Sequence, residues 1–258
     1  MTVSTYLESI KNKAYQKDIT ITNSINTIKR RLDYFFSSEI KEHFVFGSYS
    51  RNTMLPRSYD RFSDVDYMIV FKNVIHQPQT YLNKLKKFVN FYYSTSEIKQ
   101  SHPTIQLNLN HITFELVPAS HSIFYGYQIP SKDDLLGRWM QTDPLDFNMQ
   151  LTNCNKNNKS LIKPLIRIMK YWNANSGYVF ESYQLEKKIV SFNYFWCSTL
   201  KEYFYSAVEQ LSAPYEFAYW KKLKIQKLKD SVKLAKYYET IDCPFSAEKE
   251  IKSILPEI

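Results

Sequence analysis

Two neighbouring stretches decide the fold: Phe46–Thr53, with the sequence FGSYSRNT, and Ser63–Val70, with the sequence SDVDYMIV. In the second stretch, β-branched and aromatic residues alternate with the two aspartates, which predicts a strand over residues 64–71. Residues i and i+2 of a strand point to the same face, about 6–7 Å apart, so Asp64 and Asp66 are expected to hold one cation or to bridge two. Mg²⁺ prefers such hard oxygen ligands together with substrate phosphates.

A third carboxylate, Glu115, is on another predicted strand. Residues 112–117 alternate apolar and polar side chains, with Glu115 on the less apolar face, and residues 104–109 alternate in the same way. The two runs predict a hairpin that turns near Asn110 and His111. If the second run neighbours the strand of the aspartates, Glu115 lies beside them, and the three carboxylates suit two cations about 3.5–4 Å apart.

The first stretch predicts a phosphate-binding turn. A short apolar strand over residues 43–46 ends at Gly47 and Ser48, and Ser48 is expected to cap a helix that begins there. A helix N-terminus offers unpaired N–H groups and a positive dipole end to a phosphate. The chain has only 4 glycines in 258 residues, so Gly47 is expected to serve a close backbone approach. Turn and carboxylates together predict a site for two divalent cations and a nucleoside triphosphate.

A helix predicted over residues 161–174 carries an apolar stripe and a second, basic stripe. Lys163, Arg167 and Lys170 recur at i, i+4 and i+7, so they share one face. Three cations near an active cleft would hold a triphosphate; a solvated helix face is the alternative. The run Lys221–Lys229 is likewise either a solvated surface, which is the favoured interpretation, or a site for RNA, DNA or another acidic partner.

The composition of the chain indicates which binding partners and which cellular compartment to expect. The formal net charge of +9 favours polyanionic partners such as nucleotides or nucleic acids, although a basic solvated surface would give the same charge. No apolar run approaches the roughly 20 residues of a membrane span, and the N-terminus lacks a basic-then-apolar signal. The 3 cysteines have no CxxC spacing, which favours the cytoplasm over a zinc site or a disulfide framework. The oligomeric state stays open.

The pattern along the chain predicts an α/β fold in two domains. Residues 1–150 are expected to form a catalytic core with N-terminal helices and a short mixed sheet, and residues 151–258 a helical nucleotide-binding lobe, with the active cleft between them. The boundary falls in residues 126–160, which look rich in loops because of Pro130, Pro144 and a polar run. Helices are expected at 4–16, 20–42, 78–93, 161–174, 183–206 and 216–238, followed by a tail with one short helix.

The motifs resemble those of a known superfamily. Gly47-Ser48-x₄-Thr53, then Asp64-x-Asp66, then Glu115 within FELVPA, resemble the DNA-polymerase-β-type nucleotidyltransferases. Their spacing, a later KYW helix and the segment SYQLE are similar to the branch of bacterial cyclic-oligonucleotide synthases (CD-NTases), cyclic GMP-AMP synthase and oligoadenylate synthase. The resemblance covers roughly residues 20–210. The third acid is often Asp in this superfamily, and archaeal-type CCA-adding enzymes share much of the pattern.

The resemblance implies roles for these residues. It implies that Mg²⁺, or Mn²⁺, is bound as two ions by the three carboxylates, and that the turn with Thr53 binds the triphosphate. It also directs the basic stripe and Ser182 toward the phosphates and stacks Tyr183 on a base. The implied metal ligands and catalytic residues are Asp64, Asp66 and Glu115, and the implied nucleotide-binding residues are Gly47, Ser48, Thr53, Lys163, Arg167, Lys170, Ser182 and Tyr183.

The function implied first is a nucleotidyltransferase that makes a cyclic di- or trinucleotide second messenger from ATP and other NTPs, in bacterial anti-phage defence. An acceptor hydroxyl attacks the α-phosphate of an NTP and pyrophosphate leaves, and catalysis is mostly positioning and charge stabilisation. One alternative is addition of nucleotides to an RNA 3′ end, as CCA-adding enzymes or tRNA-targeting toxins do. Another is a non-catalytic nucleotide- or RNA-binding module. An RNA or DNA activator or acceptor stays open, as does the choice of bases.

Overall fold

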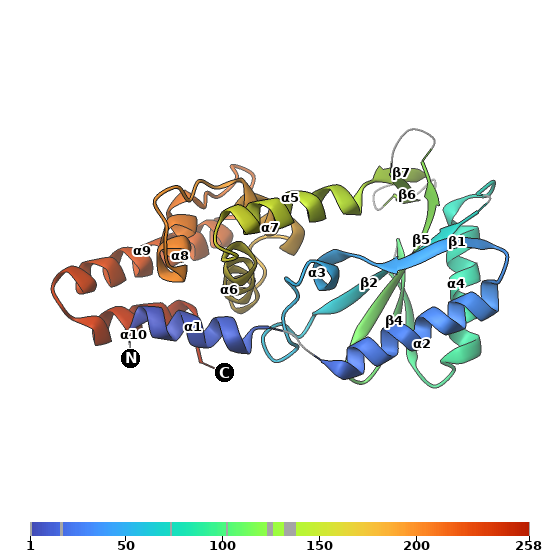
Figure 1. The fold of residues 1–258 in the computed structure, drawn as a ribbon, viewed down its shortest axis with the longest axis horizontal. Coiled ribbons are helices and arrows are strands. Elements are labelled where there is room, and N and C mark those ends of the chain that lie inside the picture. The colour runs from blue at the N-terminus through green and yellow to red at the C-terminus, as the bar shows by residue number, and fades with distance from the viewer. Residues whose placement is uncertain are drawn as a thin grey trace. The chain divides into compact units, whose positions relative to one another are not determined.

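The computed structural model describes residues 2–15, 18–72, 74–101, 103–122, 126–131 and 138–257. The chain divides into two compact units (Figure 1). One, the helical unit, comprises Met1–Gln16, Asn52–Arg61 and Met149–Ile258; the other, the sheet unit, comprises Lys17–Arg51 and Phe62–Asn148. The short segment Asn52–Arg61 therefore belongs to the helical unit, although the sheet unit supplies the residues on both sides of it in the sequence.

Within the described residues, the sheet unit is built on seven strands in the order β1-β2-β5-β4-β3, and β6 and β7 extend from β5. Strands β2 and β5 are parallel, whereas the other neighbouring strands are antiparallel. The expected mixed sheet is therefore confirmed. The strands are β1 (Ile40–Val45), β2 (Asp64–Phe71), β3 (Glu97–Ser101), β4 (Thr104–Asn108), β5 (Thr113–His121), β6 (Tyr127–Pro130) and β7 (Trp139–Thr142).

Helices cover the sheet and make up most of the other unit. The sheet unit contains α2 (Ile19–Phe36), α3 (Gly47–Ser50) and α4 (Pro78–Tyr92), and α5 (Pro144–Asn157) begins in it. The helical unit contains α1 (Val3–Lys13), α6 (Ile162–Asn175), α7 (Ser182–Ser191), α8 (Leu200–Gln210), α9 (Tyr219–Thr240) and α10 (Pro244–Ile254). No helix among the described residues is long and apolar enough to cross a membrane.

An aromatic cluster fixes α2 and α4 on the sheet. The rings of Phe36 and Phe71 lie 5.5 Å apart, those of Phe71 and Tyr81 4.9 Å apart, and those of Phe36 and Phe88 5.9 Å apart. All four side chains are buried. Aromatic rings bury large apolar areas and favour tilted, edge-directed contacts, so part of the high aromatic content of the chain serves this core.

The hairpin predicted for the strands over residues 104–109 and 112–117 is confirmed. Strands β4 and β5 are antiparallel, and Asn108 pairs with Thr113 at their ends. The amide of Leu109 donates to the carbonyl of Ile112 over 2.9 Å, which closes the turn at the expected position.

Two helices are shorter than their sequence pattern predicted. The helix expected over 20–42 ends at Phe36, because Ser37 adopts a positive φ of 34° and Ile40 pairs with Phe71 in the sheet. The helix expected over 183–206 is two helices, since Phe192 leaves α7 with an extended backbone (ψ 157°) and Thr199 starts α8. In both cases a non-helical residue interrupts a periodic pattern that continues across it.

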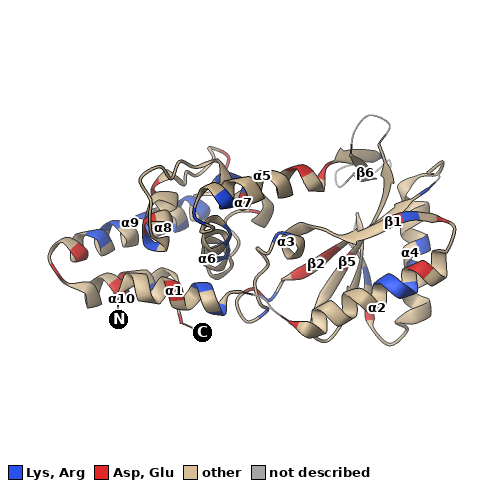
Figure 2. Ribbon diagram, in the orientation of Figure 1, with Lys and Arg blue, Asp and Glu red and all other residues tan. Residues whose placement is uncertain are grey.

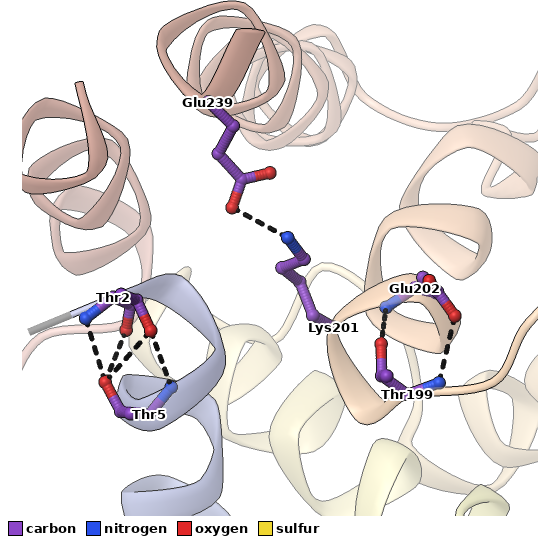
Figure 3. Close-up of polar contacts among 6 residues, drawn as sticks. All are labelled: Thr2, Thr5, Thr199, Lys201, Glu202 and Glu239. Carbon is purple, nitrogen blue, oxygen red and sulfur yellow. Dashed lines mark hydrogen bonds and ion pairs between the residues drawn. The ribbon is translucent and has the colours of Figure 1, made fainter. Parts of the chain in front are cut away.

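The start of α8 illustrates how local signals define helix ends in the helical unit (Figure 3). Thr199 Oγ1 accepts a hydrogen bond from the amide of Glu202 over 3.4 Å, and Glu202 Oε2 accepts one from the amide of Thr199 over 3.0 Å. Such a capping box satisfies two amides that lack partners within the helix. Lys201, which directly precedes Glu202, forms a 2.9 Å ion pair with Glu239 and so links α8 to α9 (Figure 3).

The region 126–160, expected to be rich in loops, instead contains β6, β7 and all of α5. Asp143 Oδ1 accepts hydrogen bonds from the amides of Leu145 and Asp146, over 2.9 and 3.1 Å, which caps the helix. Pro144 occupies the first position of α5, where a proline fits because no amide is needed. The proline that suggested a loop is therefore a helix-start signal.

Candidate active site

The three carboxylates lie on one region of the sheet. Asp66 of β2 is in register with Glu115 of the parallel strand β5, and Asp64 lies two residues before Asp66. Figure 2 shows acidic residues in red on β2. These acidic side chains are half-buried, whereas Val65 and Phe114 between them are fully buried. The alternation confirms that the two aspartates share a strand face, and the register confirms that the strand of Glu115 neighbours theirs.

Glu115 is oriented by the strand on its other side. Gln106 of β4 is in register with Glu115, and Gln106 Nε2 donates a 2.9 Å hydrogen bond to Glu115 Oε1. The amide is an uncharged donor that holds one carboxylate oxygen of Glu115 in place and leaves the other oxygen for further ligands.

The turn after β1 packs directly against β2. The amide of Phe46 donates to the carbonyl of Asp66 over 3.0 Å. Gly47 has a positive φ of 67°, and a Cβ atom there would lie 1.8 Å from Asp66 Oδ2. Glycine is therefore required at this position both by backbone conformation and by space. The expectation of a local reason for Gly47 is borne out by this contact.

The helix at this turn begins differently from the prediction. The N-cap residue of α3 is Phe46, whose side chain makes no capping hydrogen bond, and the helix begins at Gly47. Ser48 therefore lies inside the first turn, and the prediction that it caps the helix is wrong. The close approach to Asp66 requires a glycine at position 47, and this glycine is the first residue of the helix, so Ser48 is its second residue and not its N-cap. The first amides of a helix have no acceptor within it, so the turn keeps the chemistry of an anion site.

A divalent cation fits the donor set at these strands. The three acids provide hard carboxylate oxygens from neighbouring strand positions, which is the ligand type that Mg²⁺ prefers. Their side chains do not converge here: in the part of the chain that the structure describes, no group of three His, Cys, Asp or Glu residues is arranged to hold a metal ion. Strand register identifies Asp64, Asp66 and Glu115 as the residues that would hold the ion.

The basic stripe of α6 is mostly buried. Arg167 is 5% exposed and donates from a terminal nitrogen to the carbonyl of Asn52 over 2.8 Å. Its guanidinium lies 5.0 Å from the centre of the Tyr15 ring, and burial lowers the pKa of Arg167. Lys170 is also 5% exposed, whereas Lys163 is half-buried. For Arg167 and Lys170, the alternative of a solvated helix face is thus wrong.

Lys170 and Thr53 meet at a carboxylate that the sequence interpretation did not select. Thr53 donates from Oγ1 to Glu186 Oε1 over 2.8 Å, and Lys170 Nζ lies 3.4 Å from the same oxygen. All three residues are buried. The sequence held a signal for Glu186, because this acid lies between Leu185 and Ile189 on the apolar side of α7.

The remaining candidates, Ser182 and Tyr183, open α7 in the helical unit. Tyr183 is 45% exposed, and the ammonium of Lys187 lies 4.7 Å from the centre of its ring. The structure thus brings Gly47 together with Asp66 and Glu115 in the sheet unit, and Thr53 together with Lys170 in the helical unit.

Comparisons with known proteins assign the chain to a family. A family model described as a Second Messenger Oligonucleotide or Dinucleotide Synthetase domain matches residues 1–155. A probable cyclic nucleotide synthase of Bacillus cereus is 28% identical over 201 residues, which are 63% of this chain and 59% of the relative. A cyclic AMP-AMP-AMP synthase of an Acinetobacter species is 27% identical over 141 residues, which are 52% of this chain and 40% of the relative. The chain thus spans only part of the length of these curated relatives.

Fold similarity extends further than sequence similarity. The CD-NTase CdnG of Bradyrhizobium diazoefficiens, solved in complex with GTP, has a TM-score of 0.71 at 10% identity, with 96% of this chain and 97% of that chain covered. The expected mixed α/β fold and the resemblance of the motifs are both confirmed: the chain belongs to the Second Messenger Oligonucleotide or Dinucleotide Synthetase domain family, within the CD-NTases.

Proposed function

We propose that this protein is a nucleotidyltransferase that joins nucleoside triphosphates into a cyclic di- or trinucleotide. The observation that carries the proposal is the in-register pair Asp66 and Glu115, with Asp64 on the same face and the Gly47 turn packed against Asp66. Membership of the family adds weight, because the names of the curated relatives are those of cyclic nucleotide synthases.

Each part of the site has a task in this reaction. An acceptor hydroxyl loses its proton to solvent and its oxygen forms a bond to the α-phosphorus. The bond from that phosphorus to the bridging oxygen breaks, and pyrophosphate leaves with the electron pair. Asp64, Asp66 and Glu115 would hold Mg²⁺, which lowers the pKa of the hydroxyl and neutralises charge on the phosphates. The backbone of Gly47 and Ser48 would bind the triphosphate, since amides at a helix start attract anions. Catalysis then rests on orientation and on charge stabilisation.

Ser182 and Tyr183 are proposed to bind the nucleotide from α7. Ser182 opens the helix and suits a phosphate oxygen, and Tyr183, with its half-exposed ring beside Lys187, suits a base. A ring that carries a cation on one side has its π-electron density drawn toward it, and stacking on a base tolerates any base identity. The same pair of residues would therefore bind ATP and other NTPs alike.

ATP and GTP are the substrates to test first. The Acinetobacter relative is named for a product made of AMP units, and the Bradyrhizobium structure contains GTP. A second-messenger role in the cytoplasm during anti-phage defence belongs to the same proposal and follows from the resemblance of the motifs to that branch.

Addition of nucleotides to RNA is the second candidate, and the lysines of α9 are the feature that would favour it (Figure 2). Lys222 donates to the carbonyl of Tyr215 over 2.8 Å, and Lys229 donates to the carbonyl of Glu209 over 3.1 Å. These lysines stabilise the chain around α9. We therefore favour synthesis from NTPs alone.

One experiment separates these functions. The protein is incubated with α-labelled ATP, GTP, CTP and UTP, with Mg²⁺ or Mn²⁺, with and without RNA or DNA. A labelled small product that resists phosphatase supports the proposal, because a cyclic product has no terminal phosphate. Label that enters RNA promotes the second candidate. Absence of both products, with NTP binding retained, would leave a binding module. The variant Asp64→Asn/Asp66→Asn serves as the inactive control.

A further inference from the structure

The segment Asn52–Arg61 connects the two candidate catalytic elements of the sheet unit. It directly follows α3, which begins at Gly47, and it ends shortly before Asp64 at the start of β2. Its packing contacts, however, are with the helical unit. Contacts that fix this segment therefore also restrict, through the backbone, the turn at Gly47 and Ser48 and the strand β2 with Asp64 and Asp66. These two elements are called the phosphate turn and the carboxylate strand below.

The first end of the segment is anchored to α6. Arg167 donates to the carbonyl of Asn52 over 2.8 Å, and this arginine is 5% exposed. Asn52 has a positive φ of 59°, a conformation that asparagine tolerates better than most residues. A buried guanidinium that binds a backbone carbonyl fixes the direction of the chain at this point, because guanidinium groups present their donors in a rigid plane.

The next residue is held by a buried polar network. Thr53 is completely buried, and its hydroxyl donates to Glu186 Oε1, with which Lys170 forms an ion pair. A carboxylate without solvent depends on such partners, and removal of one leaves the others with an uncompensated polar group. The network therefore holds Thr53 in one position.

The second end of the segment is also fixed. Tyr178 donates from its hydroxyl to Asp60 Oδ1 over 2.7 Å, and the ring of Tyr59 lies edge-on to Tyr171 with a centroid distance of 4.7 Å. Burial and the Asp60 carboxylate raise the pKa of Tyr178, so its hydroxyl remains a donor. The segment is thus held at both ends by residues that lie on α6 or directly follow it.

Glu186 connects this anchor to the proposed nucleotide-binding end of α7. It lies four residues after Ser182 and three after Tyr183, so one helical turn separates it from both. A helix is rigid over one turn, and a displacement at Ser182 or Tyr183 therefore displaces Glu186 with it.

We propose that Glu186 is a positioning residue for nucleotidyl transfer: through its hydrogen bond to Thr53 it couples nucleotide binding at the start of α7 to the phosphate turn and the carboxylate strand. The inference rests on the proposed function. It assigns Thr53 to Glu186 rather than to the triphosphate, which is the role that the motif resemblance implied for Thr53.

Thr53→Val tests the coupling, because valine keeps the shape of threonine and loses only the hydroxyl. We expect kcat to fall about ten- to hundredfold, the effect of losing one hydrogen bond to a charged group, while KM for the NTP stays within about threefold. Thr53→Ser should recover most of the rate, since serine keeps the donor. Glu186→Gln should also lower kcat, because it removes the negative charge that the Thr53 hydroxyl and Lys170 contact. The effects of Thr53→Val and Glu186→Gln should be less than additive in the double variant, because both changes act on one network.

Thr199→Val is the matched control. It removes a threonine–glutamate contact from the capping box of α8, in the same unit but outside the anchor. Both valine variants should lower the melting temperature, but only Thr53→Val should lower kcat and speed amide hydrogen exchange in residues 47–66. A larger KM effect than kcat effect for Thr53→Val would overturn the proposal in favour of a direct contact between Thr53 and the triphosphate. Equal kcat in Thr53→Val and Thr199→Val would overturn it as well.

The two proposals fail separately. If the wild-type protein makes no phosphodiester product from NTPs, the proposed function fails, and hydrogen exchange with a bound non-hydrolysable NTP then decides about the coupling. The NTP should slow exchange in residues 47–66 of the wild type and not in Thr53→Val. Equal protection in both proteins would overturn the coupling without reference to catalysis.

Discussion

The carboxylate of Asp66 occupies the space that any side chain at Gly47 would need. The Cβ atom of an alanine there would lie 1.8 Å from Asp66 Oδ2, and the backbone at Gly47 has a φ of 67°. One glycine therefore lets the proposed phosphate-binding turn and the proposed metal-binding strand approach each other to contact distance. The tight fit makes the position sensitive to the smallest possible addition.

Gly47→Ala should abolish product formation while the protein still folds. The methyl group must displace the Asp66 carboxylate, and a positive φ in alanine costs about 1–2 kcal/mol. Gly177→Ala is the matched control, because Gly177 also has a positive φ, of 85°, but its nearest neighbour would be a Trp220 ring atom at 3.9 Å. Both variants should lose similar stability in urea unfolding, and only Gly47→Ala should lose activity. Comparable activity in the two variants would contradict the assigned role of the Asp66 contact.

Asp64→Asn/Asp66→Asn, and separately Glu115→Gln, should lower turnover by at least about a hundredfold, since a metal ion supplies several kcal/mol of charge stabilisation. The fold should persist, because the three side chains are half-buried rather than part of the core. Glu97→Gln on the exposed strand β3 is the control and should behave as wild type. Activity that survives either carboxylate change in a folded protein would remove the metal-site proposal, as would full activity in the presence of EDTA.

Tyr183→Ala should raise the KM for NTPs about tenfold, because base–aromatic stacking is worth about 1–3 kcal/mol. Tyr183→Phe keeps the ring and should change KM much less. Tyr237→Ala, at another half-exposed tyrosine on α9, is the control for removal of a surface ring. Steady-state kinetics with each NTP make the comparison, and identical KM values in the alanine and phenylalanine variants would assign Tyr183 to packing.

Charge reversal at Lys224 and Lys227 should leave synthesis from NTPs within a few-fold of wild type. Both lysines are exposed on α9, and we interpret them as part of a solvated face. In an RNA-dependent enzyme each lost phosphate contact would lower the salt slope of RNA binding by about one. The measurement is product formation and RNA affinity at several salt concentrations. If the wild type makes product only when RNA is added, and the double variant loses that RNA-dependent activity, the second function replaces the first.

Acid should remove part of the stability that the α8 capping box provides. Hydrogen bonds from the amides of Ser198 and Thr199 lower the pKa of Glu202 below its ordinary value of 4.5. The unfolded chain therefore binds the proton more readily, so the contribution of Glu202 is complete above pH 4.5 and is lost as pH falls through the lowered value. Glu202→Gln should be less stable than wild type at pH 7 and approach it in acid. Urea unfolding at several pH values tests this, with Glu216→Gln as a control that should track wild type throughout.

Local patterns predicted the centre of the fold and missed its edges. Strand β2 follows from strict alternation around Asp64 and Asp66, and the neighbouring strand of Glu115 follows from the same rule. Strands β6 and β7 are short, and β6 depends on pairing with β5 and β7 on pairing with β6, which no local pattern reveals. The partners of Lys170 were equally hidden, since the meeting of Lys170 with Glu186 requires α6 and α7 to pack, and helical periodicity alone assigns a lysine to the surface.

The parallel pairing of β2 with β5 also bears on the order in which the strands of the sheet pair during folding. Strands β3, β4 and β5 follow one another and pair with their sequence neighbours, whereas β2 reaches β5 only across α4, β3 and β4. Contacts between distant residues close a longer loop and form more slowly than local hairpins. We therefore expect Asp66 and Glu115 to come together later in folding than the residues of the β3–β4 and β4–β5 hairpins. The carboxylate pair would then form only after β5 has been synthesised and β2 has paired with it across the two hairpins.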